Sequence, residues 1–134
     1  GYLTALQQIV VPIGLHYKPQ LIIISSGQDA SWLDPLASMM MTMQGYRAMS
    51  QLIVDLAAEV CAGRLVMLQE GGYSAPYVPY CAAATVEPLL GIDLGIIDLY
   101  ATAPELKSCQ TLLSQDTQQA LAAIRIYHRR WWRI

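Results

Sequence analysis

The chain has 134 residues, a net charge of −2, and 54% hydrophobic but only 13% charged residues. This length fits one domain at most, and the charge gives no electrostatic case for binding nucleic acid or an anionic membrane. Because charged residues normally make up about a quarter of a globular domain, much of the surface is expected to be covered. The cover would be either the chain itself or another protein segment, and a homo-oligomer is one such arrangement.

The first segment combines helical spacing with a break. Pro12 lies inside the apolar pattern and predicts a kink or an early end, because proline lacks a backbone N–H. The apolar residues of this pattern are Leu3, Leu6, Ile9, Val10 and Ile13. After Lys18-Pro19-Gln20, the β-branched run over 21–24 predicts a parallel strand that is covered on both faces.

A second helix and a second strand follow. Thr42 is a suitable N-cap for this helix, and Gly63 is expected to end it. The apolar stripe comprises Tyr46, Met49, Ile53, Leu56 and Val60. The run over 65–68 predicts another buried strand, so residues 21–68 form a strand–helix–strand unit with parallel strands.

The remaining segments predict two more helices. One extends from Tyr73 to about Leu90 and ends at Gly91, and the last covers about Asp116 to Trp132. The most apolar long stretch, over 75–103, is interrupted by prolines and carboxylates, so no membrane span is expected. Together the elements predict an α/β fold with a parallel sheet.

The cysteines bear on the cellular compartment. Cys61, Cys81 and Cys109 are odd in number and far apart, which favours buried, unreactive thiols over a disulfide framework or a thiolate zinc site. No signal segment opens the chain, and a cytoplasmic location is therefore predicted. The first residue is Gly1 rather than methionine, which favours a fragment or a processed product.

Polar residues follow both predicted strands. Asp34 lies in the loop after the first strand, and Gly71-Gly72-Tyr73 follows the second. Ligands of open parallel sheets bind beyond the carboxyl ends of the strands. Asp34 and Tyr73 are therefore candidate site residues, and Gly71 and Gly72 would let the backbone approach a ligand closely.

Each of these residues also has a structural interpretation. Asp29 and Asp34 would be ordinary loop caps, Tyr73 a core residue with a satisfied hydroxyl, and the glycine pair a turn. His16 and His128 are expected to be structural rather than ligands. The terminal arginines are expected to complement a helix dipole; they are Arg125, Arg129, Arg130 and Arg133.

The motifs in combination are more specific than any one of them. Ser-Gly-x-Asp-Ala at 26–30, Asp-Pro-Leu at 34–36, Thr42 with Gly45, and Glu-Gly-Gly-Tyr at 70–73 occur in that order. This order resembles the histone deacetylase and acetylpolyamine amidohydrolase family, especially its bacterial, class II-like members. The resemblance extends to about residue 90 and resumes weakly at 128–132.

The resemblance implies a three-layer αβα fold of the arginase–deacetylase type and a zinc-dependent amidohydrolase. Asp34 matches a carboxylate ligand of the family's zinc ion (Zn2+), and Tyr73 matches its catalytic tyrosine. Gly71 and Gly72 would contact the substrate. The substrates implied are small acetylated amines or acetyl-lysine, which would be hydrolysed to a free amine and acetate.

The chain also departs from the family pattern. An Asp-x-His pair of zinc ligands and a His-His pair stand upstream in the family, and nothing in this chain replaces them. Residues 1–134 are therefore expected to be the carboxyl-terminal part of a single catalytic domain, to need its missing amino-terminal part, and to be inactive alone. Gln28 stands where the family usually has phenylalanine, which leaves the substrate preference open.

Two other function classes remain open. One is a non-catalytic regulatory or interaction module that keeps the fold without the chemistry. The other is a phosphate-binding domain at Gly71-Gly72, which the absence of Gly-x-Gly-x-x-Gly and of a Walker lysine disfavours.

Overall fold

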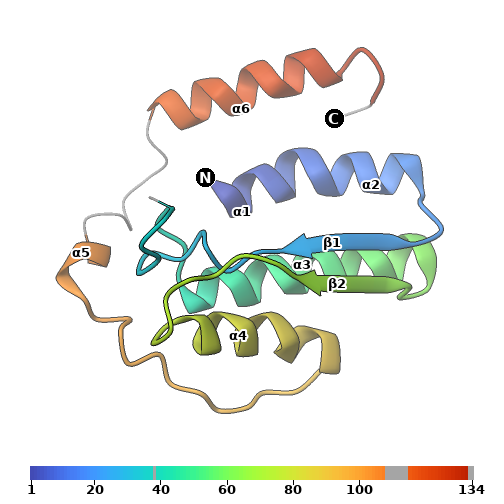
Figure 1. Cartoon of the computed structure of the whole chain (residues 1–134). Coiled ribbons are helices and arrows are strands. Elements are labelled where there is room, and N and C mark those ends of the chain that lie inside the picture. Colours follow the sequence, from blue (N-terminus) through green and yellow to red (C-terminus); the bar gives the residue numbers. More distant parts are fainter. Residues whose placement is uncertain (38, 108–114, 133–134) are drawn as a thin grey trace.

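Figure 1 shows the computed structural model, which describes residues 1–37, 39–107 and 115–132. The elements in chain order are α1 (Tyr2–Ala5), the π-helical turn η1 (Leu6–Val10), α2 (Val11–Tyr17), β1 (Ile22–Ser26), α3 (Met43–Cys61), β2 (Leu65–Gln69), α4 (Val78–Leu90), α5 (Pro104–Lys107) and α6 (Gln115–His128). Among the described residues, no helix combines the length and apolar character needed to cross a membrane.

The predicted strand–helix–strand unit is confirmed. β1 and β2 pair in parallel, in a register that runs from Ile22 opposite Leu65 to Ser26 opposite Gln69. β1 extends two residues beyond the predicted end, because Ser25 and Ser26 continue the ladder. Both strands therefore deliver their following loops to the same edge of the sheet.

The described helices cover one face of the sheet and leave the other exposed. Ile24 and Met67 line a cavity together with residues of η1 and α3, so this face lies under helices. On the other face Ile23 is 60% exposed, Val66 44% and Leu68 53%. The prediction of strands covered on both faces is therefore wrong for the described part of the chain, whose helices protect one face.

The first helical segment does not end at Pro12. The chain continues through η1 and α2 to Tyr17 and stops at Lys18, which has a left-handed φ of 52°. A π-helical turn immediately precedes the proline. Because a proline ring crowds the carbonyl four residues earlier and offers no N–H, a widened turn is a natural way to accommodate it.

The start of α3 is as predicted, and its end is slightly earlier. The Thr42 hydroxyl accepts a hydrogen bond from the Gly45 N–H at 3.2 Å, as an N-cap does. The helix ends at Cys61, and Ala62, rather than a glycine, takes the left-handed conformation with φ of 53°. Gly63 follows it, also with positive φ.

The later helices are shorter than predicted. α4 begins at Val78 rather than near Tyr73, because a turn forms first, in which the Tyr77 and Val78 N–H groups donate to the Ser74 carbonyl. It ends at Leu90, as predicted, and Gly91 follows in the left-handed conformation with φ of 64°. α6 ends at His128, four residues before the predicted limit.

The core lies between α3 and α4. Its fully buried residues are Met43, Tyr46, Tyr77, Cys81 and Ala84. The Tyr77 hydroxyl donates to Asp98 Oδ2 at 2.8 Å and accepts from the Met43 N–H at 2.9 Å. Burial raises the pKa of Cys81 to about 12, which agrees with an unreactive thiol. Cys61 is also free and buried, and Cys109 lies outside the described residues.

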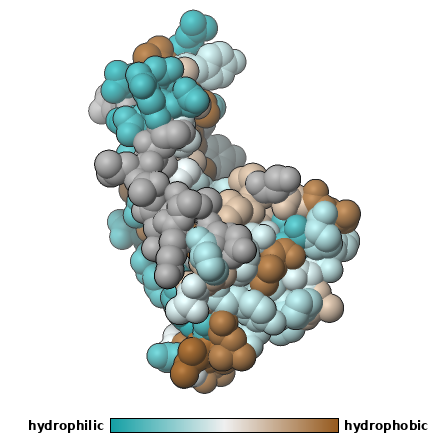
Figure 2. Space-filling view, turned by 90° about the vertical axis from the view of Figure 1, so that its left-hand side faces the viewer, coloured by the Kyte–Doolittle hydropathy of each residue, from teal (hydrophilic) through white to brown (hydrophobic). Residues whose placement is uncertain are grey.

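Exposed apolar side chains gather in the segment that follows α4. Its large exposed residues are Ile92, Leu94, Ile97 and Leu99. In Figure 2, hydrophobic atoms cluster at the lower end of the molecule, where Figure 1 places this segment. This exposed apolar surface agrees with the high apolar content of the sequence. That the chain associates with another protein segment or with a second copy stays a prediction.

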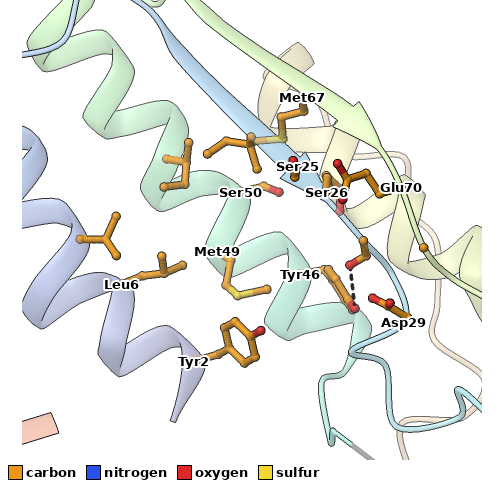
Figure 3. A pocket seen from close by; sticks show the side chains of 16 residues that line it. Tyr2, Leu6, Ser25, Ser26, Asp29, Tyr46, Met49, Ser50, Met67 and Glu70 are labelled. Atoms are coloured by element: carbon orange, nitrogen blue, oxygen red, sulfur yellow. Dashed lines mark hydrogen bonds between the residues drawn. The ribbon is translucent and has the colours of Figure 1, made fainter. Parts of the chain in front are cut away.

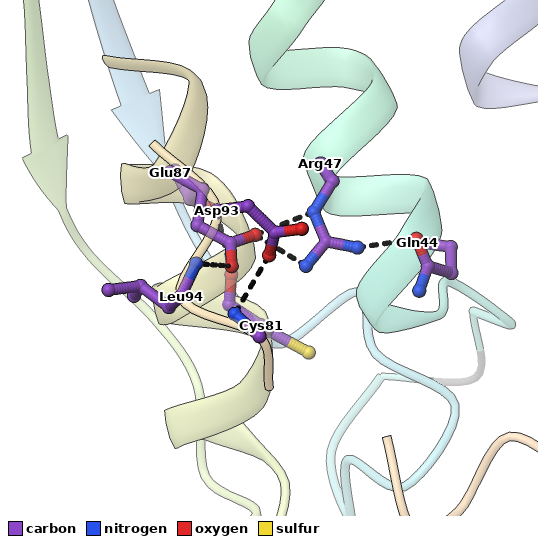
Figure 4. A network of polar contacts seen from close by, with 8 residues as sticks. Gln44, Arg47, Cys81, Glu87, Asp93 and Leu94 are labelled. Carbon is purple, nitrogen blue, oxygen red and sulfur yellow. Dashed lines mark hydrogen bonds and ion pairs between the residues drawn. The ribbon is translucent and has the colours of Figure 1, made fainter. Parts of the chain in front are cut away.

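A buried ion pair joins α3 to α4 (Figure 4). Arg47 Nε donates to Glu87 Oε2 at 2.5 Å, and the Leu94 N–H donates to the other carboxylate oxygen at 3.0 Å. The Glu87 side chain is 2% exposed, whereas the Arg47 side chain is 29% exposed. If the ion pair is broken, water can therefore solvate the Arg47 side chain but not the Glu87 carboxylate.

We expect Arg47→Met to lower the free energy of unfolding by roughly 3 kcal/mol or more, because it leaves a buried carboxylate without its cation. Glu87→Gln should cost less, since the Arg47 guanidinium can hydrate. Urea unfolding of both variants measures the difference. Asp55→Asn removes an exposed negative charge and keeps an oxygen that can accept from Gln51. It is the control and should stay within about 0.5 kcal/mol of wild type. Equal losses for the first two variants would contradict the assignment.

Candidate functional site

The loops that follow β1 and β2 lie side by side. The Gln28 N–H donates to the Gly71 carbonyl at 2.6 Å, and the Glu70 N–H donates to the Ser26 carbonyl at 3.1 Å. The parallel register produces this contact, because it ends both strands at one edge. The first loop carries Asp34 and the second carries Tyr73.

The structure brings the two candidate residues into direct contact. Asp34 Oδ2 accepts a hydrogen bond from the Tyr73 backbone N–H at 2.8 Å. Its Oδ1 accepts from the N–H groups of Leu36 and Ala37 at 2.9 and 3.3 Å. Asp34 therefore caps its own loop, as one interpretation of the sequence holds, and also fixes the neighbouring loop.

The Asp34 carboxyl is buried, with 9% of the residue exposed, and is nevertheless stabilised as an anion. Burial raises its pKa, but hydrogen bonds from backbone N–H groups, that of Tyr73 foremost, lower the pKa below its ordinary value. Hydrogen bonds to the charged form outweigh desolvation here. At neutral pH the site presents a fixed negative charge.

Tyr73 is a surface residue with an anchored backbone. The residue is 56% exposed, so the interpretation of Tyr73 as a core residue with a satisfied hydroxyl is wrong. Its backbone, in contrast, is held by Asp34. The phenol thus projects from a fixed point at the edge of the sheet, where a bound molecule can reach it.

The packing of the two loops leaves little room for side chains at the glycine pair. A Cβ at Gly71 would lie 2.5 Å from Asp29 Oδ2, and one at Gly72 would lie 3.0 Å from Gln28 Cβ. Gly72 also has φ of 143°, which side chains other than glycine rarely adopt. Protein atoms occupy the space that side chains at these positions would take. Contact of Gly71 and Gly72 with a substrate stays a prediction.

An open cavity of about 430 Å³ lies on the helix-covered side of these loops (Figure 3). Tyr2 and Leu6 line one wall, Tyr46 and Met49 of α3 another, and Asp29 the end near the loops. Asp34 and Tyr73 are not among its lining residues. The cavity therefore adjoins the Asp34–Tyr73 site through Gly71 and Asp29 without containing it.

Tyr46 and Gln28 lie near the site but were not among the predicted site residues. The buried Tyr46 hydroxyl donates to the Gly27 carbonyl at 3.4 Å, and burial raises the pKa of this phenol. Gln28 is 1% exposed although its side chain is polar. In the sequence, the only sign of a role for Gln28 is that a polar residue stands between Gly27 and Asp29. Its burial could not be predicted, because it depends on contact with the neighbouring loop.

Asp34 is the one residue for which the sequence predicts a metal-ligand role. Within residues 1–37, 39–107 and 115–132, no group of three His, Cys, Asp or Glu side chains could hold a metal ion. His16 and His128 pack against aromatic rings, those of Trp132 and Tyr127. The ionised, fixed Asp34 carboxylate suits one ligand position, but a catalytic zinc normally needs three protein ligands.

The fold and the paired loops define the class of protein. Solved structures share the arrangement: the HDA15 HD domain matches 98% of this chain with a TM-score of 0.75 and 28% identity. The histone deacetylase Clr3 matches 98% with a TM-score of 0.78 at 24% identity, which supports the fold alone. The chain therefore has the arginase–deacetylase fold, as a part of its αβα layers.

Sequence comparison identifies the family. The model of the histone deacetylase domain matches residues 1–89, and the chain belongs to this family. A histone deacetylase-like amidohydrolase of Pseudomonas aeruginosa is 43% identical over 98 residues, which are 73% of this chain and 26% of that protein. Histone deacetylase 8 of Arabidopsis thaliana is 35% identical over 129 residues, 96% of this chain and 32% of that protein. The chain thus spans about a third or less of these relatives.

Proposed function

We propose that this chain forms part of the catalytic domain of a zinc-dependent amidohydrolase that releases acetate from acetylated lysine, polyamines or similar amines. One observation carries the proposal: the Asp34 carboxylate and the Tyr73 backbone are joined at 2.8 Å. Membership of a family whose named relatives are deacetylases supports it. The remaining zinc ligands would come from the part of the domain that this chain does not span.

Each residue has a separate task in this proposal. Asp34 would contribute one carboxylate ligand, held in place by backbone N–H groups. The zinc ion, when bound, would polarise the amide carbonyl and lower the pKa of a water molecule. The Tyr73 hydroxyl would donate a hydrogen bond to the carbonyl oxygen as negative charge develops there. Gly71 and Gly72 would place the backbone of this loop beside the substrate.

The overall reaction balances with water as the only co-reactant. Water adds to the acetyl carbon, the bond between that carbon and nitrogen breaks, and the nitrogen takes a proton as the free amine leaves. Acetate is the second product. We place this activity in the cytoplasm as part of the same proposal. The free thiols of Cys61 and Cys81 support this location, because disulfides are rare in reducing compartments.

We expect the 134-residue chain alone to show no zinc-dependent hydrolysis of acetyl-lysine or acetylpolyamine substrates, because it supplies one metal ligand. The complete domain, meaning this chain together with the remaining length present in its relatives, should hydrolyse at least one of them. A fluorogenic acetyl-lysine peptide and an acetylated diamine, each assayed with and without chelator, make the comparison.

Two results would contradict the proposal. Chelator-sensitive turnover by the isolated chain would show that the catalytic groups are misassigned. A complete domain that binds zinc but hydrolyses no acetylated amine would favour the non-catalytic module.

A further inference from the structure

Gln28 is a polar residue that is buried where the two site loops meet, and the proposed function assigns no role to it. Its backbone N–H donates to the Gly71 carbonyl at 2.6 Å, and its carbonyl accepts from the Ser31 N–H at 3.2 Å. With 1% of its surface exposed, its carboxamide must find partners inside the protein, because an unpaired buried amide is costly.

Those partners connect the ends of the two strands. Gln28 Nε2 donates to Ser26 Oγ at 3.2 Å, and Gln28 Oε1 accepts from the Gln69 side-chain amide. The same Gln69 nitrogen also donates to the carbonyls of Glu70 and Gly71, each at 3.4 Å. A continuous polar bridge therefore leads from β1 to the peptide groups immediately before Gly72.

The bridge ends at the Gly71 carbonyl, two residues before the candidate tyrosine. Gly72 packs so closely that a Cβ there would lie 3.0 Å from Gln28 Cβ. The next N–H, that of Tyr73, is bonded to Asp34. The loop is thus held on one side through Gln28 and Gln69 and on the other through Asp34.

We propose that Gln28 is a positioning residue of this site. Its carboxamide orients the Gln69 amide, which holds the carbonyls of Glu70 and Gly71, and so sets where the Tyr73 hydroxyl stands relative to Asp34. The role rests on the proposed function. Gln28 itself touches neither the substrate nor the metal in this scheme.

The activity test uses the complete domain with Gln28→Met, which keeps the length of the side chain and removes its polar atoms. We expect kcat to fall about tenfold while KM and bound zinc stay within about twofold, since displacing a catalytic group affects the transition state more than binding. Gln69→Met should match this loss, and the double variant should lose no more than either single one. Gln51→Met, on the exposed face of α3, is the matched control.

An unchanged kcat, or losses that multiply in the double variant, would overturn the role of Gln28. A structural readout separates this outcome from failure of the proposed function. In Gln28→Met, amide hydrogen exchange at Gln28 and Tyr73, whose N–H groups bond across the loops, should be at least about tenfold faster than in wild type and in Gln51→Met. Unchanged exchange would overturn the positioning role even if no acetylated amine is hydrolysed, whereas faster exchange in an inactive domain would support the bridge and reject only the deacetylase chemistry.

Discussion

Tyr73→Phe in the complete domain is expected to lower kcat by about a hundred- to a thousandfold and to change KM little, because one hydrogen-bond donor to the developing oxyanion is lost. The fold should be unaffected. Tyr73 is 56% exposed, and the contact that anchors it to Asp34 comes from its backbone N–H, which phenylalanine retains. Steady-state kinetics and zinc analysis of the same preparations measure the effect.

Tyr17→Phe is the matched control for this experiment. Tyr17 is 68% exposed and lies at the end of α2, so its variant should keep wild-type kinetics. The free energy of unfolding should change by less than about 0.5 kcal/mol in both variants, as is usual for surface positions. Near-normal kcat in Tyr73→Phe with intact zinc would remove the phenol from the mechanism.

Asp34→Asn is expected to reduce zinc affinity by at least about tenfold and to abolish most activity. A neutral amide is a poorer ligand for a divalent cation, and even residues that only support a ligand typically cost about 10–100-fold in affinity. The structure adds a second cause. Both carboxylate oxygens accept backbone N–H groups, and the amide nitrogen of asparagine cannot accept, so one loop loses its anchor.

Asp29→Asn separates these two causes from a general loss of negative charge. Asp29 belongs to the same loop, and its carboxylate lies against Gly27 and Gly71, but no ligand role is assigned to it. We expect its zinc content to remain close to wild type. Metal analysis of the two folded variants tests whether Asp34 is a zinc ligand. Full zinc occupancy in Asp34→Asn would reject this assignment.

The sequence by itself determined the order of the elements around the site. Apolar β-branched runs and a capped amphipathic helix are local signals, and they predicted the parallel unit of β1, α3 and β2 correctly. The Asp-Pro-Leu and Glu-Gly-Gly-Tyr motifs predicted the family in the same way. Local signals also misplaced the start of α4, because a turn at Ser74 competes there with the apolar pattern. They did not predict the π-helical turn before Pro12, and the early end that they allowed there does not occur.

Only the tertiary structure decided how the site is held together. The bond between Asp34 and Tyr73 joins residues 39 positions apart, and the bridge between Gln28 and Gln69 joins residues 41 positions apart. Neither pair has a local pattern, because each depends on the parallel register that ends both strands at one edge. The burial of Gln28 is also decided by the tertiary structure. A glutamine is usually exposed, but Gln28 is buried here because the second loop packs against it.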